Sequence, residues 1–540
     1  MNKKPTGSAI DRRSMVKSGT ALIGAGLIGS LAVPQNVTTG KNCSNFFSVC
    51  DFGATGKRTD NATIAVRSAI DACTNAGGGT VYVPPGDYTV GTIQLKNNVN
   101  LNLEAGATLF LSQDQADFIQ GSRAMIFAQD VHNIAVTGRG TLDGLAKYEY
   151  VEMRGIDPEI SVEIEIAREA GVDMRRYYRT GMQTYMFILN NCTGVSLTDI
   201  SVINSPLWNI RLNDCNRVYI RGIYIYSDLE KGVNADGIDI CCTSNVTISD
   251  SVIVTGDDAI VLKTPQRKGQ EKVNPVENIV VTNCILTSSS TPLMIGTETF
   301  ADIRHVIFSN CTLRNSNKGF GINVQDGATV SDIIFRNLTI ETSRRHWNWW
   351  GSAELCKFKL SRRDETSKLG RIKDIVVDTV ISHVRGTATI KGHGEQPLEN
   401  IRINNVQIFM EPEDAIDKRC SHSLVMEDVK ELSIHDLTIK WNEEDTEDKW
   451  GSALVLRNIS DFEIRSFRGR QGIKGKEAPA ILLECISDGL IADSVADQGC
   501  EIFIEVSRTD SRKIILRNNN TTKSASAVSL VGAEEASESK

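Results

Sequence analysis

Three aspartates in two short acidic runs near the middle of the chain carry side chains that could perform acid–base chemistry. Asp236 lies in the run Asn234–Asp239, and Asp257 and Asp258 follow about 21 residues later, directly after Gly256. Hydrolysis of a glycosidic bond requires one carboxyl group that keeps its proton and others that stay ionised to activate water. A single aspartate more often terminates a β-turn, but the clustering of three favours a catalytic site.

An imperfect repeat of β-patterned segments explains how these aspartates could meet. Segments of eight residues, in which β-branched and polar residues alternate, recur mostly at intervals of about 23 to 33 residues. A propeller blade needs about 40–45 residues, so this shorter period favours a solenoid. The sequence therefore predicts an all-β, single-domain, right-handed parallel β-helix, in which the two acidic runs lie on adjacent rungs roughly 4.8 Å apart. The segments begin at Val195, Val218, Val246, Ile279, Val306, Ile333, Ile375, Ile401, Leu432, Phe462 and Leu490.

Composition and charge exclude several classes of protein. The chain has 540 residues, of which 41% are hydrophobic and 23% charged, and its net charge is −8. Because no basic stripe stands out, we expect no nucleic-acid partner. The 13 cysteines show no metal-ligand spacing, so we expect neither a metal nor another cofactor. Four of them follow Asn or Asp at similar places in the repeat, which favours buried apolar packing: Cys192, Cys215, Cys284 and Cys311.

The ends of the chain and one interruption define the expected organisation. Arg12-Arg13 and the apolar run Ser18–Val33 predict a twin-arginine (Tat) signal peptide over residues 1–33, and hence a periplasmic or secreted protein. The run is shorter than the roughly 20 residues that span a bilayer, so we expect no membrane contact in the mature form. We expect the β-helix over residues 44–520, a charged, helix-prone insertion at about 146–186, and a disordered tail at 521–540. We expect the protein to be a monomer.

Several motifs resemble those of glycoside hydrolase family 28, the polygalacturonase and rhamnogalacturonase family. The family's Asn-Thr-Asp-Gly and Gly-Asp-Asp motifs are similar to Asn234–Gly237, with Ala235 in place of Thr, and to Gly256–Asp258. The resemblance spans most of the mature chain, and its further motifs are Asp51–Gly56, Gly77–Pro84, Gly138–Gly144 and Ser205–Trp208.

The resemblance also implies roles for particular residues. It makes Asp257 the general acid, and it makes Asp236 and Asp258 the groups that position and deprotonate the attacking water. It further implies inversion at the anomeric carbon, with the acid and base carboxyl groups about 6.5–9.5 Å apart. The other residues that we expect to bind substrate are Asn234, Trp208, Glu298 and Lys263, the last being either a substrate contact or an ion-pair partner of the carboxylates.

Two departures from the family pattern concern the substrate. No His occurs near Thr291, and no Arg or Lys occupies Gly321 or Asn323, where the family's Arg-Ile-Lys motif should fall. Since Arg pairs with carboxylates by charge-assisted hydrogen bonds that Asn cannot replace, we expect plain polygalacturonan to be a poor substrate. Rhamnogalacturonan-type or other mixed acidic oligomers should be better.

The segment 344–350 offers substitute binding groups. Its Trp349 and Trp350 could stack on sugar rings, and Arg344 or Arg345 could pair with a uronate. If polygalacturonan were hydrolysed efficiently, Arg344, Arg345 or Lys318 would be the replacement cations.

Two rival functions remain open on the sequence alone. A polysaccharide lyase on the same kind of helix would need Ca²⁺-binding carboxylates and a basic residue near the cleaved bond. A non-catalytic β-helix that binds a glycan would tolerate loss of the acidic trio, whereas an enzyme would not.

Overall fold

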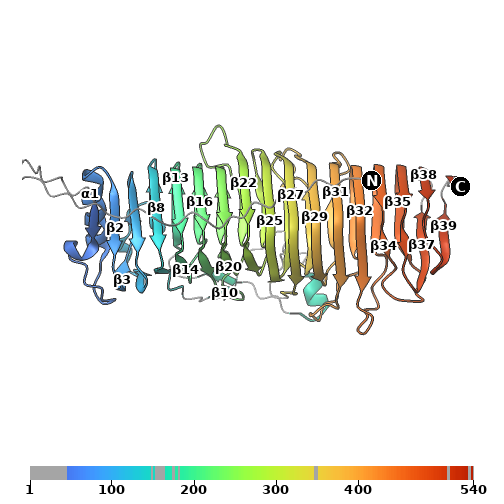
Figure 1. The fold of residues 1–540 in the computed structure, drawn as a ribbon, viewed down its shortest axis with the longest axis horizontal. Coiled ribbons are helices and arrows are strands. Elements are labelled where there is room, and N and C mark those ends of the chain that lie inside the picture. The colour runs from blue at the N-terminus through green and yellow to red at the C-terminus, as the bar shows by residue number, and fades with distance from the viewer. Residues whose placement is uncertain are drawn as a thin grey trace, which may run out of the picture. The chain divides into compact units, whose positions relative to one another are not determined.

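The computed structural model describes residues 45–146, 150–152, 165–172, 177–179, 183–345, 351–507, 511–532 and 537–538. The predicted signal peptide, Trp349 and Trp350 lie outside these residues. The described strands stack along one axis (Figure 1), and 38 of them form a single hydrogen-bonded sheet that winds as a coil. The right-handed parallel β-helix predicted from the sequence is confirmed.

Each rung of the coil contributes up to three short strands. One rung holds β12 (Tyr185–Asn190), β13 (Thr193–Thr198) and β14 (Ser201–Ile203), and each of them pairs in parallel with a strand of the next rung. The first stack, which carries the candidate site, consists of β7 (Ala124–Gln129), β12, β15 (Ile210–Asn213), β18 (Ile238–Cys241), β21 (Ile260–Thr264), β24 (Leu293–Thr299), β26 (Lys318–Val324), β28 (Glu354–Leu360) and β30 (Ala388–Lys391).

The other two stacks lie on the remaining sides of the coil. The second consists of β8 (His132–Gly138), β13, β16 (Asn216–Arg221), β19 (Ser244–Ser249), β22 (Val276–Thr282), β25 (Ile303–Ser316), β27 (Thr329–Thr342), β29 (Arg371–Val384) and β31 (Leu398–Met410). The third consists of β9 (Thr141–Asp143), β14, β17 (Tyr224–Tyr226), β20 (Val252–Thr255) and β23 (Ile285–Ser288). From β25 onward one long strand spans both, since β22 and β23 both pair with it.

The rungs at the two ends differ from the rest. Strands β1 (Phe46–Ser48) and β2 (Gly79–Val83) and helix α1 (Thr63–Asn75) lie at the N-terminal end of the stack (Figure 1). Helix α1 buries Val66, Ala69 and Ile70. Strands β32 (Leu424–Trp441), β33 (Leu454–Arg465), β35 (Pro479–Ala492), β37 (Cys500–Ser507), β38 (Arg512–Arg517) and β39 (Ser524–Val531) continue it to the C-terminal end.

The repeat found in the sequence sets the register of the second stack. Val195 pairs with Val218 and Val218 with Val246, and every later segment start pairs with the next as far as Phe462. The last start is wrong by one residue, because Phe462 pairs with Gly489 and not with Leu490. A Cβ at residue 489 would lie 2.0 Å from the Phe462 ring, so a glycine fills the inward position and displaces the apolar pattern by one residue.

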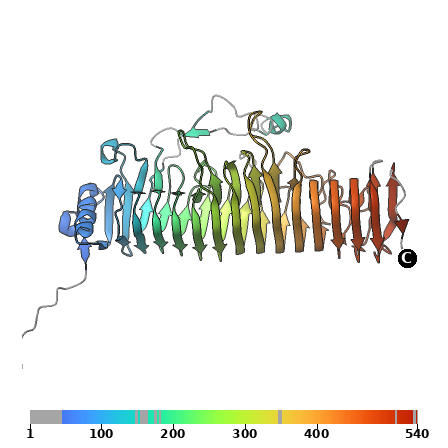
Figure 2. The same ribbon diagram turned by 90° about the horizontal axis from the view of Figure 1, so that it is seen from above.

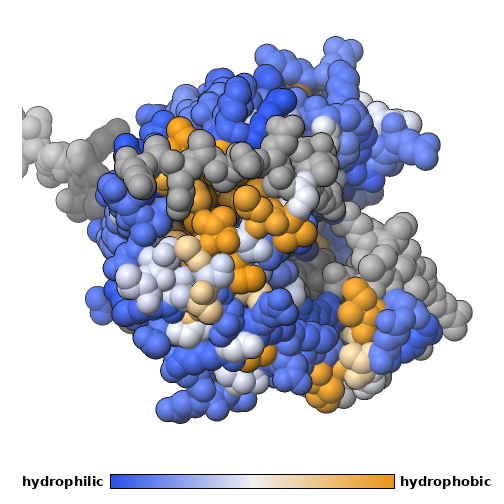
Figure 3. Space-filling model, turned by 90° about the vertical axis from the view of Figure 1, so that its right-hand side faces the viewer, coloured by the Kyte–Doolittle hydropathy of each residue, from blue (hydrophilic) through white to orange (hydrophobic). Residues whose placement is uncertain are grey.

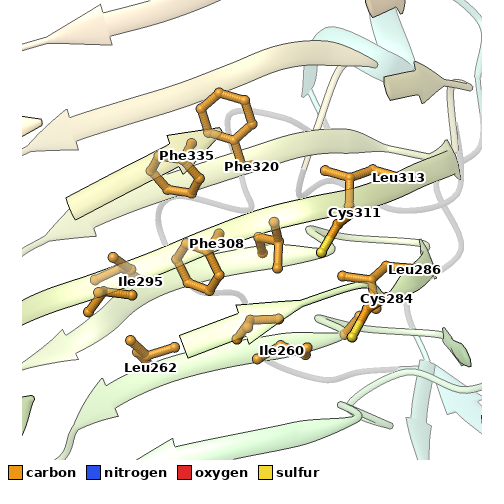
Figure 4. Close-up of a cluster of buried hydrophobic side chains, with 14 of the residues drawn as sticks. Ile260, Leu262, Cys284, Leu286, Ile295, Phe308, Cys311, Leu313, Phe320 and Phe335 are labelled. Atoms are coloured by element: carbon orange, nitrogen blue, oxygen red, sulfur yellow. The ribbon is translucent and has the colours of Figure 1, made fainter. Parts of the chain in front are cut away.

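Inward-facing side chains fill the coil. Phe335 stacks on Phe320 with ring centroids 4.4 Å apart and on Phe308 at 5.1 Å, and Cys284 and Cys311 lie among the same apolar residues (Figure 4). Burying each of these rings contributes roughly 1.5–3 kcal/mol. The prediction that the repeated cysteines are buried is confirmed for all four.

Asparagines at the turns link successive rungs. Asn337 Nδ2 donates to Asn310 Oδ1 at 2.7 Å, whereas Asn283 donates to an aspartate of the preceding rung, Asp250, at 3.2 Å. These asparagines have φ between 52° and 56°, a left-handed conformation that Asn adopts more readily than most residues.

The predicted insertion contributes two pieces to the described structure. Strands β10 (Tyr150–Glu152) and β11 (Tyr177–Arg179) pair antiparallel, and residues 165–169 are helical. Neither piece joins the large sheet, and both lie on one side of the stacked strands (Figure 2). Within the described residues, no helix is long and apolar enough to cross a membrane.

The prediction of a disordered tail is wrong for residues 524–531. They form β39, which pairs in parallel with β37 and adds a further rung. The sequence pattern does not predict this strand, because Ser and Ala alternate there with few large apolar residues. Apolar side chains gather on the C-terminal end face (Figure 3). In β38 and β39, Ile515, Leu530 and Val531 are each about half exposed.

Candidate active site

One column of side chains runs along the edge where the strands of the first stack begin. Ile238, Ile260, Leu293 and Phe320 are in register on successive rungs. The residues two positions before them therefore occupy equivalent places, and we call these residues the site column: Trp208, Asp236, Asp258, Thr291, Lys318 and Glu354. Backbone hydrogen bonds hold neighbouring rungs together here, such as Gly237 N–H to Asp258 O at 2.9 Å.

Two of the three aspartates identified in the sequence, Asp236 and Asp258, belong to the site column, and Asp257 lies beside them. One carboxylate oxygen from each of Asp236, Asp257 and Asp258 lies within 4.8 Å of the others. Asp236 and Asp257 are buried, and Asp258 is partly exposed. The backbone N–H of Asp258 donates to Asp257 Oδ1 at 2.9 Å, and that of Thr291 donates to Asp258 Oδ1 at 3.0 Å. These bonds fix the two carboxylates that follow Gly256.

One oxygen of each carboxyl group lies within 4.8 Å of one oxygen of the others, whereas the expected 6.5–9.5 Å describes the separation of the whole acid and base carboxyl groups and stays a prediction. A water molecule can bridge two oxygens 4.8 Å apart, since two hydrogen bonds of about 2.7 Å reach across that distance.

A buried lysine neutralises part of this acidic cluster. Lys263 Nζ lies 2.8 Å from Asp239 Oδ1 and 3.3 Å from Asp236 Oδ2. Burial opposes the charge of Lys263, but Asp239 and Asp236 outweigh it and raise the pKa of the ammonium. Ion pairing, one of the two roles left open by the sequence, is therefore observed for Lys263, and substrate contact stays a prediction.

Burial also shifts the pKa values of the carboxyl groups. It raises the pKa of Asp257 well above the usual range, and repulsion by Asp236 and Asp258 adds to the rise. Burial raises the pKa of Asp236 to about 6, although Lys263 opposes the rise. Asp257 is thus suited to hold a proton at a pH where Asp236 is ionised.

The same three aspartates could in principle hold a cation. Three carboxylate oxygens within 4.8 Å of one another form a possible ligand set. The Lys263 ammonium, 3.3 Å from Asp236, already supplies positive charge there and would repel a metal ion bound to the same oxygen. The donor set is therefore better suited to proton transfer.

An aromatic and cationic platform lies one to two rungs before the aspartates. Lys263 Nζ lies 4.0 Å from the centre of the Trp208 ring, and the Arg211 guanidinium lies 4.9 Å from it. Arg211 also donates to the Tyr185 hydroxyl at 3.3 Å. Trp208 thus lies at the site, as predicted, and its ring packs against the ion-paired ammonium of Lys263.

Sequence reasoning missed Asp239 and Arg211. Both project outward from buried strands, Asp239 between Ile238 and Ile240 and Arg211 between Ile210 and Leu212. A charged residue flanked by two inward apolar residues is the signal that could have identified them, because alternate side chains of a strand face opposite sides.

The surroundings of the other predicted substrate-binding residues differ. Asn234 is exposed in the turn before Asp236, with φ of 56°. Glu298 is half-buried near the end of β24, close enough to Cys241 to add to the rise in thiol pKa that burial causes. Trp349 and Trp350 lie outside the described residues.

Arg344 and Arg345 are engaged within the protein. The Arg344 side chain has no exposed area and pairs with Asp417 at 2.9 Å and Glu413 at 3.6 Å. Arg345 Nη2 donates to the backbone oxygen of Asn315 at 2.7 Å. The expectation that Arg344 meets substrate is therefore wrong, because its charge is already neutralised inside the fold.

Known proteins share both the sequence pattern and the architecture. A polygalacturonase of Malus domestica is 25% identical over 240 residues, which cover 44% of this chain and 48% of the relative. An exo-poly-alpha-D-galacturonosidase of Dickeya chrysanthemi is 24% identical over 286 residues, 46% of each chain. The chain thus spans about half the length of the curated relatives it matches.

Solved structures show the same fold. The exopolygalacturonase of Thermotoga maritima superposes with a TM-score of 0.60 and 22% identity over 73% of this chain and 91% of that one. The family 28 exopolygalacturonase of Yersinia enterocolitica gives 0.61 and 20% over 78% of each. The family model of glycosyl hydrolases family 28 matches residues 73–423. Because that match covers more than half of the sequence and includes all three aspartates, the chain belongs to glycosyl hydrolases family 28.

Proposed function

We propose that the protein hydrolyses glycosidic bonds in pectic or related acidic polysaccharides, with Asp257 as general acid and with Asp236 and Asp258 activating water. The observation that carries the proposal is the convergence of three carboxylates within 4.8 Å beside a buried lysine. Such a site costs stability, since buried like charges repel, and catalysis is the usual reason to maintain it.

The proton donor is assigned from the environment of each carboxyl group. Asp257 has the pKa raised furthest from the usual range among groups that can reach a leaving oxygen, first through burial and then through its two acidic neighbours. A protonated Asp257 gives its proton to the departing glycosidic oxygen.

Two aspartates on adjacent rungs, Asp236 and Asp258, activate the water. Asp236 and Asp258 hold a water between them, and Lys263 keeps Asp236 ionised by lowering its pKa. The water attacks the anomeric carbon, its C–O bond forms as the glycosidic C–O bond breaks, and the water's proton passes to a carboxylate. Direct attack by water inverts the configuration.

The proposed function includes export of the protein. The twin-arginine motif at Arg12-Arg13 supports delivery of an already folded enzyme across the inner membrane, with residues 1–33 as signal peptide. Polymeric pectic substrates lie outside the cell, so an exported location agrees with the substrate class.

Substitution of the aspartates tests the assignment. Asp257→Asn is nearly isosteric but cannot donate the proton, so we expect turnover to fall by about 10²–10⁴-fold. Asp236→Asn and Asp258→Asn should also be severe. Asp250→Asn is the control, because Asp250 is exposed on the same part of the coil and bonds to Asn283. More than about a tenth of wild-type rate in all three site variants would refute the proposal.

The stereochemical course is tested separately. Early-time NMR of the products should show the anomer opposite to that of the substrate. Retaining enzymes form a covalent glycosyl-enzyme before water attacks, so the anomer of the first product distinguishes the two courses. A retained anomer or a trapped glycosyl-enzyme would contradict direct attack by water.

A further inference from the structure

A lysine occupies the site column two rungs beyond Asp258. Lys318 begins β26, two residues before the inward-facing Phe320, just as Asp258 stands two residues before Ile260. Gly321, which follows Phe320, faces outward, and a Cβ there would lie 3.7 Å from Lys318 Cδ. The aliphatic stem of Lys318 therefore lies against the outer face of the sheet, beside the acidic trio and not in the apolar core.

The Lys318 side chain is nearly buried, and among the residues that the structure describes its ammonium has no hydrogen-bond partner. Its side chain is 9% exposed, and the nearest carboxylate oxygen, Glu354 Oε1, is 4.0 Å away, beyond hydrogen-bond distance. Glu354 itself accepts a hydrogen bond from the backbone N–H of Ser352. Burial lowers the pKa of Lys318, Glu354 and Asp258 oppose that fall, and Lys357 adds to it. A buried cation without a hydrogen bond is costly unless a ligand supplies the acceptor.

A second lysine stands beside it on the next rung. Lys357 is in register with Gly321, faces outward and is exposed. Among the described residues, no hydrogen bond or ion pair involves its ammonium. Gly321 has no side chain that could separate Lys318 from Lys357, and Met294 Sδ lies 2.9 Å from the place where a Cβ of residue 321 would be.

We infer that Lys318 and Lys357 form a carboxylate-binding subsite for a uronic acid residue of the substrate, on the C-terminal side of the acidic trio. This inference rests on the proposed function and names the sugar that the site accepts. No cation stands at Gly321 or Asn323. Lys318, at the start of the same strand, and Lys357, on the next rung, take their place. Of the three replacement cations that the sequence offered, Arg344 and Arg345 are engaged elsewhere, and Lys318 remains. Substrates with a uronate at this displaced position are therefore accepted. The expectation that plain polygalacturonan is a poor substrate then applies only to a uronate that needs cations at residues 321 and 323.

Binding to the inactive Asp257→Asn protein tests the subsite without requiring turnover. Calorimetric titration would compare an oligogalacturonate with the same oligomer after methyl esterification of its carboxylates. Lys318→Met should weaken binding of the acid by about ten- to hundredfold, the loss expected for a hydrogen bond to a charged group. Lys357→Met should weaken it less, because an exposed charge is screened. Neither substitution should change binding of the ester.

Two further variants make the comparison decisive. Lys391→Met is the control, since Lys391 lies on the same sheet but already pairs with Glu427 at 3.0 Å; it should bind both ligands as the parent does. Lys318→Arg should retain the preference for the acid. If Lys318→Met does not fold, Lys357→Met decides alone.

The outcomes separate this inference from the proposed function. Equal losses for acid and ester, or no loss in either lysine variant, would overturn the subsite even if the Asp257-containing enzyme hydrolyses pectic oligomers. A preference for the acid that depends on the lysines, in an enzyme that cleaves none of these oligomers, would support the subsite and refute the proposed hydrolysis.

Discussion

Removal of the Lys263 charge should move the acidic limb of the pH–rate profile upward. The base Asp236 must be ionised to activate water, and its pKa of about 6 already reflects an opposing effect of Lys263. Lys263→Met removes an attraction acting over 3.3 Å, so the pKa of Asp236 rises and ionisation requires a higher pH. Activity falls as the pH decreases below the pKa of Asp236, so in the variant this fall begins at a higher pH.

The distance gives the magnitude. Two unit charges 3.3 Å apart attract by about 5 kcal/mol at an effective dielectric constant of about 20, equivalent to roughly 3–4 pH units at about 1.36 kcal/mol each. Water that enters the vacated space reduces this effect, so we expect a shift of about 1–3 units. At pH 5 the variant should then be about ten- to thousandfold slower than wild type, and closer to it at pH 8.

The assay is kcat/KM measured from pH 4 to 9 at constant ionic strength. Lys263→Arg should restore most of the wild-type profile, because it keeps the charge. Lys391→Met, which removes a paired lysine of the same sheet, should leave the profile unchanged. An active Lys263→Met enzyme whose acidic limb stays near pH 6 would refute the role of Asp236 as the base held ionised by Lys263.

Three further substitutions test stability. Asp257→Asn should raise the melting temperature at pH 7, and this gain should become smaller toward pH 4. Burial raises the pKa of Asp257, so its ionisation opposes folding only above the unfolded-state pKa of about 3.9. An equal gain in melting temperature at both pH values would contradict this. Arg344→Met should cost about 3–5 kcal/mol of unfolding free energy by leaving buried carboxylates unpaired, with KM unchanged in the folded protein. Gly489→Ala should cost about 1–3 kcal/mol through overpacking against Phe462, whereas Gly394→Ala, where a Cβ meets nothing within 4 Å, should be nearly neutral by denaturant titration.

The fold and the acidic trio were accessible from the sequence because both depend on local patterns. Alternation of apolar and polar residues has the two-residue period of a strand, and its recurrence from Val195 to Phe462 predicted the register correctly. The short spacing between Asp236 and Asp257 corresponds to one rung, so their proximity followed directly. The pattern failed at Leu490, where Gly489 takes the inward position, and at β39, whose small side chains carry little pattern.

Which charges face the site was decided by the tertiary structure. Arg344 is 73 residues from Asp417 in the chain, and only the packed loops bring them together and remove that arginine from the surface. Lys263 meets Asp239, and Lys318 enters the column of Asp258, because rungs of unequal length stack in register. Sequence alone determined the coil and its acidic residues, since strand alternation is local. Only the stacked structure determined which cations are paired and which remain for a ligand, since burial and ion pairing depend on residues that are distant in the chain.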